Sequence, residues 1–217
     1  MCGHSYTCMV LATLPTRTKT MDTAVSIGLR AKTGRAIAVV LGGRVDAPQI
    51  LKRLEIKLAD SDYPETSQPY HEVLDLPWDK AQIAVRKIAS RIEKKAAKEI
   101  ARLVREAQAE GAVVCGVGIV GAGDRNLEKI GSTHIRAHAA EGVLFRAVLE
   151  SGAAANDLPN MRFDERGLDQ TAESQLRLSS AKIKAHLTEM GRAAGSPWRA
   201  DEKAAATAAW LVLANSG

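Results

Sequence analysis

The first patterned part of the chain is built from short apolar segments separated by turn residues. Residues 24–31 (AVSIGLRA) and 36–43 (AIAVVLGG) flank the turn-like sequence KTGR, which predicts a β-hairpin. Residues 49–59 (QILKRLEIKLA) alternate apolar and charged side chains, which predicts a third strand at an edge of the sheet. We therefore expect three consecutive antiparallel strands.

Helical spacing of apolar residues begins further along the chain. Residues 78–110 carry isoleucine, leucine, valine and alanine at intervals of three and four, which predicts one long helix. Residues 112–123 (AVVCGVGIVGAG) are a continuous apolar run, which is typical of a buried central strand. Ser132 or Thr133 can cap the next helix, which is expected to run from Thr133 to about Ser151.

The last third of the chain is less regular. Residues 156–174 are polar and suggest no particular element, and residues 175–187 fit either a strand followed by a helix or a single helix. Ser196 followed by Pro197 is typical of a helix cap and first turn, so a final helix is expected to extend to about Ala214. The predicted order is three strands, helix, strand, helix, a strand of uncertain place, and helix.

Composition and charge narrow the class of protein. With 46% hydrophobic and 25% charged residues, the 217-residue chain is typical of a globular protein. The net charge of +5 permits a phosphate-rich partner such as nucleic acid without requiring one. Three cysteines argue against a disulfide framework, and no apolar run approaches the roughly 20 residues that cross a bilayer. We expect a cytoplasmic protein without a membrane partner.

The N-terminal segment differs from the rest. Residues 1–22 lack periodic patterning and are predicted to be a disordered arm, while residues 23–215 are predicted to form one domain. Cys2, His4 and Cys8 have no fourth ligand nearby, so this arm is not expected to hold a metal. Met21 is an alternative start of the protein.

Three polar residues share one face of the helix predicted after the central strand. His134, His138 and Glu141 fall within about 60° of one another, and the aromatic ring of Phe145 continues their stripe, so they are expected to point inward. A buried carboxylate needs a partner. This pattern predicts a metal or acid–base site, with zinc, manganese or iron fitting the donors better than magnesium. The alternative is that Glu141 bonds an arginine or histidine and locks the helix to the sheet.

Asp201 is the acidic candidate on the final helix. It shares a face with small residues that let a helix lie close to a sheet, so it is expected to complete the metal site with Glu141. The alternative is a structural role, because an acid in a first turn is favoured by the helix dipole. Trp198, Arg199 and Lys203 surround Asp201 and are expected to form the rim of a substrate pocket.

Two further features bear on binding. Tyr70 and His71 lie in the loop before the long helix and are expected to face the substrate, although a surface turn is the alternative. The long helix carries many basic residues interleaved with glutamates, which is typical of a solvated face, with a nucleic-acid track as the alternative. These basic residues are Lys80, Arg86, Lys87, Arg91, Lys94, Lys95, Lys98, Arg102 and Arg105.

The order of elements and three segments resemble the RuvC-like branch of the ribonuclease-H-like superfamily, the Holliday-junction resolvases and their relatives. The segments are VSIGLRAKTGRAIAVV, HIRAHAAEGVLFRAVLE and SPWRADEKAAATAAWLVLA, and the resemblance covers Thr23 to Ala214. It implies an α/β fold with a ribonuclease-H-like mixed sheet and helices on both faces. It also implies divalent-metal-dependent cleavage of nucleic acid.

The acidic residues of that family are mostly missing here. No acid follows Ser26 and Ile27 on the first strand, no glutamate occurs in residues 113–120, and Ala204 stands where the final helix would carry its second acid. Asp201 matches the first acid of that pair. Two-metal cleavage needs several carboxylates around ions about 4 Å apart, so one acid does not suffice for the family's mechanism.

Two functions from different classes follow from the sequence. The first is a metal-dependent phosphodiester hydrolase, with Glu141 and Asp201 holding manganese, zinc or magnesium, His138 as ligand or base, and His134 as a further ligand. The second is a catalytically inactive relative that binds nucleic acid or a protein through the long helix. A further possibility, beside these two functions, is a small-molecule site under Trp198 and Tyr70. No organic cofactor is expected, and the oligomeric state, including a homodimer, is left open.

Overall fold

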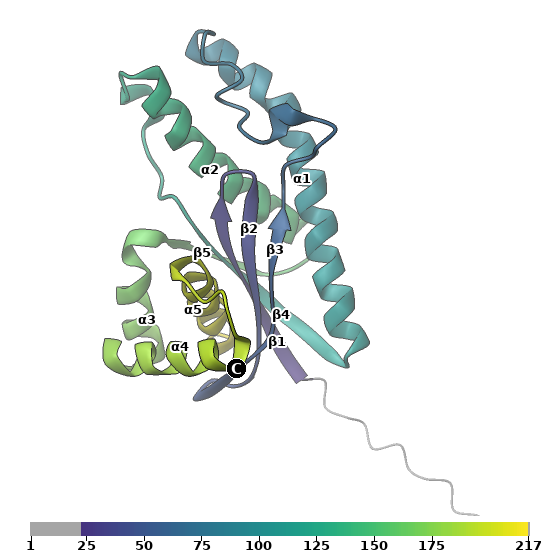
Figure 1. Cartoon of the computed structure of the whole chain (residues 1–217), viewed down its shortest axis with the longest axis vertical. Coiled ribbons are helices and arrows are strands. Elements are labelled where there is room, and N and C mark those ends of the chain that lie inside the picture. The colour runs from purple at the N-terminus through teal and green to yellow at the C-terminus, as the bar shows by residue number, and fades with distance from the viewer. Residues whose placement is uncertain (1–22, 217) are drawn as a thin grey trace, which may run out of the picture.

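The computed structural model describes residues 23–216, which form a five-stranded mixed sheet flanked by helices (Figure 1). The strand order is β3-β2-β1-β4-β5; β1 pairs antiparallel with β2 and β2 with β3, whereas β4 is parallel to both β1 and β5. The strands are β1 (Thr23–Lys32), β2 (Arg35–Arg44), β3 (Ala47–Lys57), β4 (Ala112–Gly121) and β5 (Asn160–Asp164).

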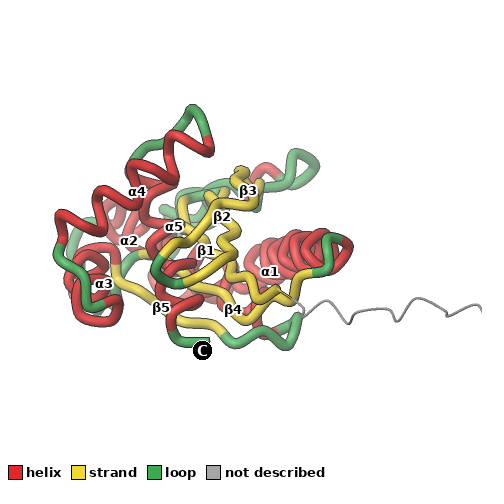
Figure 2. The backbone as a smooth tube through the Cα atoms, turned by 90° about the horizontal axis from the view of Figure 1, so that it is seen from below, coloured by secondary structure: helices red, strands yellow, loops and turns green. Residues whose placement is uncertain are grey.

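Helices cover both faces of this sheet. The long α1 and α2 pack on one face, around a core that includes Val25, Ile27 and Leu29 of β1. The helices α3, α4 and α5 pack on the other face, and α1 and α4 are seen on opposite sides of the strands in Figure 2. The helices are α1 (Trp78–Ala109), α2 (Thr133–Ala154), α3 (Leu168–Leu176), α4 (Ser180–Ala194) and α5 (Ala200–Ala214), with short 3₁₀ turns η1 (Pro64–Thr66), η2 (Leu127–Lys129) and η3 (Glu165–Gly167).

The alternation along β1 explains how α5 approaches the sheet so closely. Successive side chains of a strand point to opposite faces, so Ser26 and Gly28 face α5 while their neighbours face α1 and α2. The Ser26 hydroxyl donates a 2.7 Å hydrogen bond to the Ala209 carbonyl. A Cβ added at Gly28 would lie 1.8 Å from the Ala205 carbonyl oxygen, so only glycine fits there. Small residues on both elements thus set the position of α5.

The predicted α/β mixed sheet of ribonuclease-H-like order, with helices on both faces, is confirmed. The three N-terminal strands, the edge position of β3, the central β4 and the long α1 agree with the sequence predictions, and α2 extends three residues past the predicted end. The predicted arm at residues 1–22, with Cys2, His4 and Cys8, lies outside the described residues. No described helix is long and apolar enough to cross a membrane.

The C-terminal third corrects two predictions. The last strand, β5, lies within residues 156–174, and residues 175–187 contain the end of α3 and most of α4. The final helix begins at Ala200 and not at Pro197, because the Arg199 N–H is capped by Glu202 Oε2 at 2.8 Å. The segment before it is held against β3, where the Arg53 guanidinium donates to the carbonyls of Ser196 and Pro197.

Candidate metal centre

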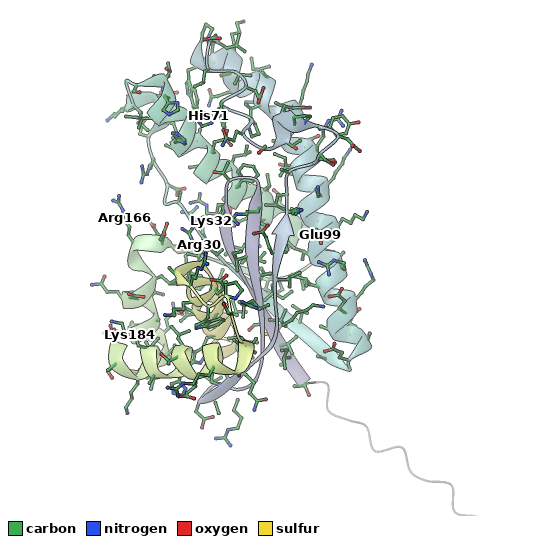
Figure 3. All side chains as sticks on the ribbon, viewed as in Figure 1. Arg30, Lys32, His71, Glu99, Arg166 and Lys184 are labelled. Atoms are coloured by element: carbon green, nitrogen blue, oxygen red, sulfur yellow. The ribbon has the colours of Figure 1, made fainter. Side chains whose placement is uncertain are left out.

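Three histidines from two distant segments converge at the start of α2. His71 lies in the loop before α1, and His134 and His138 lie on the first two turns of α2. One ring nitrogen from each lies within 4.8 Å of the others. The Nε2 atoms of His134 and His138 are 3.1 Å apart, and the His71 ring centroid is 4.5 Å from that of His138. His71 is labelled in Figure 3, beside α2.

The separation of these nitrogens constrains what lies between them. The 3.1 Å separation fits either an N–H···N hydrogen bond, in which one ring donates and the other accepts, or two rings bound to a common cation. Two nitrogens bound at 2.0–2.1 Å to a tetrahedral zinc would be about 3.4 Å apart. The observed spacing is close to that value, and three imidazoles would leave the fourth position of such an ion open.

The exposure of the three rings corrects the sequence prediction. Glu141 and Phe145 are buried, at 1% and 0% exposure, as predicted for the inward face of α2. His134 and His138, on the same stripe, are exposed, and His71 is half-buried. The reason is that the first turns of α2 project beyond the strands (Figure 1), so they have no sheet to pack against. The prediction that both histidines point into the core was therefore wrong.

Glu141 is the buried residue that links the loop to α2. Its Oε1 accepts a 2.8 Å hydrogen bond from the Tyr70 backbone N–H and lies 3.4 Å from Nδ1 of His71. Burial raises the pKa of the Glu141 carboxyl to about 7, although the backbone amides of Tyr70 and His71 oppose this shift. Burial also lowers the pKa of His71, with the charges of His138 and His134 acting in the same direction. The lowered pKa favours the neutral form of His71, which is the form that binds metals.

The remaining polar atoms of this pair show which nitrogen is available. His71 Nε2 and Glu141 Oε2 are buried and have no hydrogen-bond partner among the described residues. When Nδ1 carries the proton and faces Glu141, the lone pair of Nε2 is free for a ligand. A carboxylate behind a ligating histidine is a common arrangement at metal sites, because it fixes the tautomer and the ring orientation. The donors present fit a transition-metal ion of the zinc type.

Asp201 lies elsewhere, which corrects the predicted pairing with Glu141. Its carboxylate contacts Arg30 Nε at 3.4 Å and Lys32 Nζ at 3.3 Å, and the buried Arg30 also pairs with Glu165 at 2.6 Å. The physical reason is that α2 and α5 cover opposite faces of the sheet. Figure 3 shows Arg30 and Lys32 well separated from His71. Ion pairs thus occupy the surroundings of the acid that matches the resolvase pattern.

The predicted pocket rim around Asp201 is also separate from the histidines. The Trp198 indole N–H donates to the Leu187 carbonyl at 2.8 Å, which ties the segment before α5 to α4. Lys203 lines a cavity of 520 Å³ between α3, α4 and α5, together with Lys184. Tyr70 stands at the opposite side of the sheet, in the loop that contacts α2. A single small-molecule site under Trp198 and Tyr70 is therefore not formed.

Sequence reasoning placed His71 in a substrate-facing loop and missed its place in the histidine cluster. The available signal was the short sequence PYHE, which puts a histidine in a loop ahead of a long helix. Nothing in the spacing connects it with His134, since the two are brought together by the packing of α1 against α2. Only the folded arrangement assigns His71 to the cluster.

A second feature is the exposed side of α1, which carries a basic stripe. At 100° per residue its members fall within about 60° of one another and extend over about 38 Å. Each is exposed, and no carboxylate of the described residues lies within ion-pair distance of any of them. We call these residues the α1 basic stripe: Lys80, Lys87, Arg91, Lys94, Lys98 and Arg105.

The acids of α1 do not neutralise this stripe. Glu99 and Glu106 lie on another side of the helix, where both pair with Arg102 at 2.8 Å and Glu106 also pairs with Lys52 at 2.6 Å. Within the stripe, the guanidinium of Arg91 lies over the ring of Tyr63 at 3.7 Å. The basic residues thus form an exposed face, as predicted, but the glutamates interleaved with them in the sequence lie on another side of the helix.

Comparisons with known proteins give only distant structural likenesses. No family model matches the chain, and no curated protein matches its sequence. A Thermus thermophilus RuvC structure is 9% identical, with a TM-score of 0.48, and the alignment covers 86% of this chain and 92% of that chain. The T. thermophilus RuvC in complex with Holliday junction substrate is 10% identical, with a TM-score of 0.47 and coverage of 87% and 91%.

Proposed function

We propose that this protein is a metal-dependent hydrolase whose centre is formed by His71, His134 and His138. The observation that carries the proposal is the convergence of three imidazole nitrogens within 4.8 Å, with a buried carboxylate behind one of them. Three histidines with an open fourth position are the ligand set of catalytic zinc sites. Iron and manganese are also compatible with these donors, while magnesium prefers oxygen ligands.

In this proposal each residue of the centre has a defined role, either as a metal ligand or as a positioning residue. His134 and His138 are fixed one turn apart on α2, so their rings reach the same point. His71 is aimed at that point by its contact with Glu141, which acts as a positioning residue. A zinc-type ion bound there would supply a water of lowered pKa, near 7, as the nucleophile. The exposure of His134 and His138 leaves the open position accessible to a substrate.

Metal content of the purified full chain tests the proposal directly. We expect about one transition-metal ion per chain by elemental mass spectrometry. His138→Ala should lose the ion, and the matched control His186→Ala should keep it, because His186 lies on α4 and packs against Trp210. Hydrolysis of an activated phosphodiester should follow the metal content of each variant. Retention of the metal by His138→Ala would reject the centre.

A second candidate function is nucleic-acid binding, and the α1 basic stripe is the observation that favours it. A row of cations that have no ion-pair partner among the described residues extends over about 38 Å, which matches the length of about one turn of duplex DNA. Release of counterions from the phosphate backbone would provide the affinity, which would depend steeply on salt. The two functions are compatible, because such a surface would bring a phosphodiester substrate to the protein. A stripe that binds no duplex at low salt would remove this second function.

A further inference from the structure

A cavity of 220 Å³ lies next to the histidine cluster, between the loop before α1 and the first turns of α1 and α2. Each histidine of the cluster directly follows a residue that lines this cavity: Tyr70, Thr133 and Ala137. The cavity and the candidate metal centre are therefore built on the same three backbone segments. The volume is below the range of drug-sized ligand sites, so a compact ligand fits it best. The other lining residues are Val73, Leu74, Leu76, Pro77, Trp78, Ala81 and Arg136.

Trp78 in this wall has an unsatisfied hydrogen-bond donor. The indole N–H groups of the other two tryptophans are both paired, that of Trp198 with the Leu187 carbonyl and that of Trp210 with the Val45 carbonyl, each at 2.8 Å. The Trp78 indole nitrogen is buried and has no partner among the described residues. A buried donor without an acceptor is unfavourable. Because this nitrogen lies buried within the wall, its N–H signal reports on the wall when the cavity is filled.

Arg136 brings a positive charge to the same cavity. Its Nε donates to the Ile130 carbonyl at 2.9 Å, and its guanidinium lies 5.3 Å from the centre of the Trp78 ring. No described carboxylate lies within ion-pair distance of it, whereas the buried Arg146 pairs with both Asp124 and Glu150. No residue lining the cavity is acidic. The guanidinium Nη atoms therefore have donors available for an anion.

The other side chains of the cavity wall are mostly apolar and suit an apolar body attached to the anionic group. Six aliphatic or proline side chains line the cavity, and the ring of Tyr70 stacks on Trp78 with centroids 5.4 Å apart. Thr133 and Arg136 belong to the first turn of α2, where the helix dipole also favours negative charge. Apolar walls with a few polar groups at one end are the usual form of a small-molecule site.

We infer that this cavity binds a small organic anion, with its carboxylate or phosphate at Arg136 and its apolar body against the walls formed by Leu74 and Pro77. The ligand class is a compact ring or branched chain that bears one anionic group. Its role as the substrate of the adjacent centre rests on the proposed function, while the binding itself does not. The anionic group is either a carboxylate or a phosphate monoester, because both present oxygens that accept hydrogen bonds from a guanidinium.

Binding is tested with the metal-free full chain and three probes: benzoate, phenyl phosphate, and benzamide as the neutral analogue of benzoate. The readout is the set of three indole N–H signals in a nitrogen-resolved NMR spectrum, with the Trp78 signal assigned by its loss in Trp78→Phe. We expect benzoate or phenyl phosphate to shift the Trp78 signal and leave those of Trp198 and Trp210 in place. Benzamide should bind at least about tenfold more weakly. Comparing the first two probes identifies the preferred anion.

Arg136→Gln tests the recognition of charge. This variant should lose about tenfold or more in affinity for the anionic probe and keep that for benzamide. Arg192→Gln is the matched control, since Arg192 is exposed on α4 and pairs with Glu189. Equal binding of benzoate and benzamide by the natural protein, or an unmoved Trp78 signal with every probe, would overturn the inference.

The outcomes for the cavity and for the metal centre can be told apart because the binding experiment uses metal-free protein. Anion binding by a chain that never takes up metal would keep the cavity as a ligand site and reject the hydrolase. Metal binding without a shift of the Trp78 signal would keep the hydrolase and reject this ligand class.

Discussion

Oε1 of Glu141 lies 3.4 Å from Nδ1 of His71, although the two residues are 70 positions apart in the sequence. This contact joins the loop before α1 to the buried side of α2. It also holds the ring of His71 close to the two exposed histidines, with ring centroids 5.3 Å from His134 and 4.5 Å from His138. The candidate metal centre therefore depends on a residue that need not itself contact the metal.

Replacement of Glu141 should weaken metal binding without removing it. In Glu141→Gln the side chain keeps its size but loses its charge, so it polarises His71 less. We expect zinc affinity to fall about tenfold or more, the range seen when the partner of a ligating histidine is removed. Competition with a chelator measures the change. Asp201→Asn should leave zinc affinity unaltered, since Asp201 pairs with Arg30 and Lys32 across the sheet.

The stability of the metal-free protein should depend on pH through Glu141. Its pKa is raised from 4.5 to about 7 in the folded state, so the unfolded chain loses this proton first. The contribution to stability is fully present below pH 4.5 and is lost as the pH rises through 7. Urea unfolding at pH 5 and pH 8 should show the natural protein losing about 2–3 kcal/mol relative to Glu141→Gln. A difference that does not change with pH would contradict this prediction.

The α1 basic stripe should determine the salt dependence of any duplex binding. The triple variant Lys87→Gln, Lys94→Gln and Lys98→Gln removes three of its charges. We expect the slope of log affinity against log salt to become shallower by about 2.7, from about 0.9 for each phosphate contact.

A matched triple variant on α4 provides the control for this prediction. Lys182→Gln, Lys184→Gln and Arg192→Gln change the net charge equally but lie on exposed positions of the opposite face. Binding measured by fluorescence anisotropy should be nearly unaffected in the control. If both triples weaken binding to the same extent, the net charge of the protein and not the stripe is responsible.

Gly28 should be irreplaceable at the contact between β1 and α5. In Gly28→Ala the new methyl group would lie 1.8 Å from a backbone oxygen of Ala205, and backbone cannot move aside as a side chain can. We expect a loss of at least about 3 kcal/mol in the free energy of unfolding. Gly131→Ala is the control, because nothing lies within 4 Å of its added Cβ. Similar midpoints for the two variants in chemical denaturation would show that α5 is not held as closely as described.

Local patterns in the sequence determined most of the elements and the fold class. Period-two and period-three-to-four spacing follow from the geometry of strands and helices, so β1 to β4, α1 and α2 could be predicted within a few residues. The last strand could not, because β5 is five residues long and only Phe163 is buried, which leaves no periodic signal. The start of α5 was missed because a tertiary contact from Arg53 holds the segment before it.

Only part of the candidate site could be predicted from the sequence. The spacing of His134, His138 and Glu141 is a local property of one helix, so the sequence brought these three together. It did not determine that the helix projects beyond the sheet at its first turns, which exposes both histidines and buries only Glu141. The length of strand available beneath α2 decides this, and it is a property of the assembled layers.

Tertiary structure alone decided which distant residues joined the site. Packing of α1 on α2 carries the preceding loop, and with it His71, to the two histidines. The sheet separates α5 from α2, so Asp201 pairs with Arg30 and Lys32 and cannot share an ion with Glu141. The sequence determined the residue types and their spacing within each element. The arrangement of helices on the two faces of the sheet determined which of those residues meet, because side chains interact over a few ångströms of space regardless of their separation along the chain.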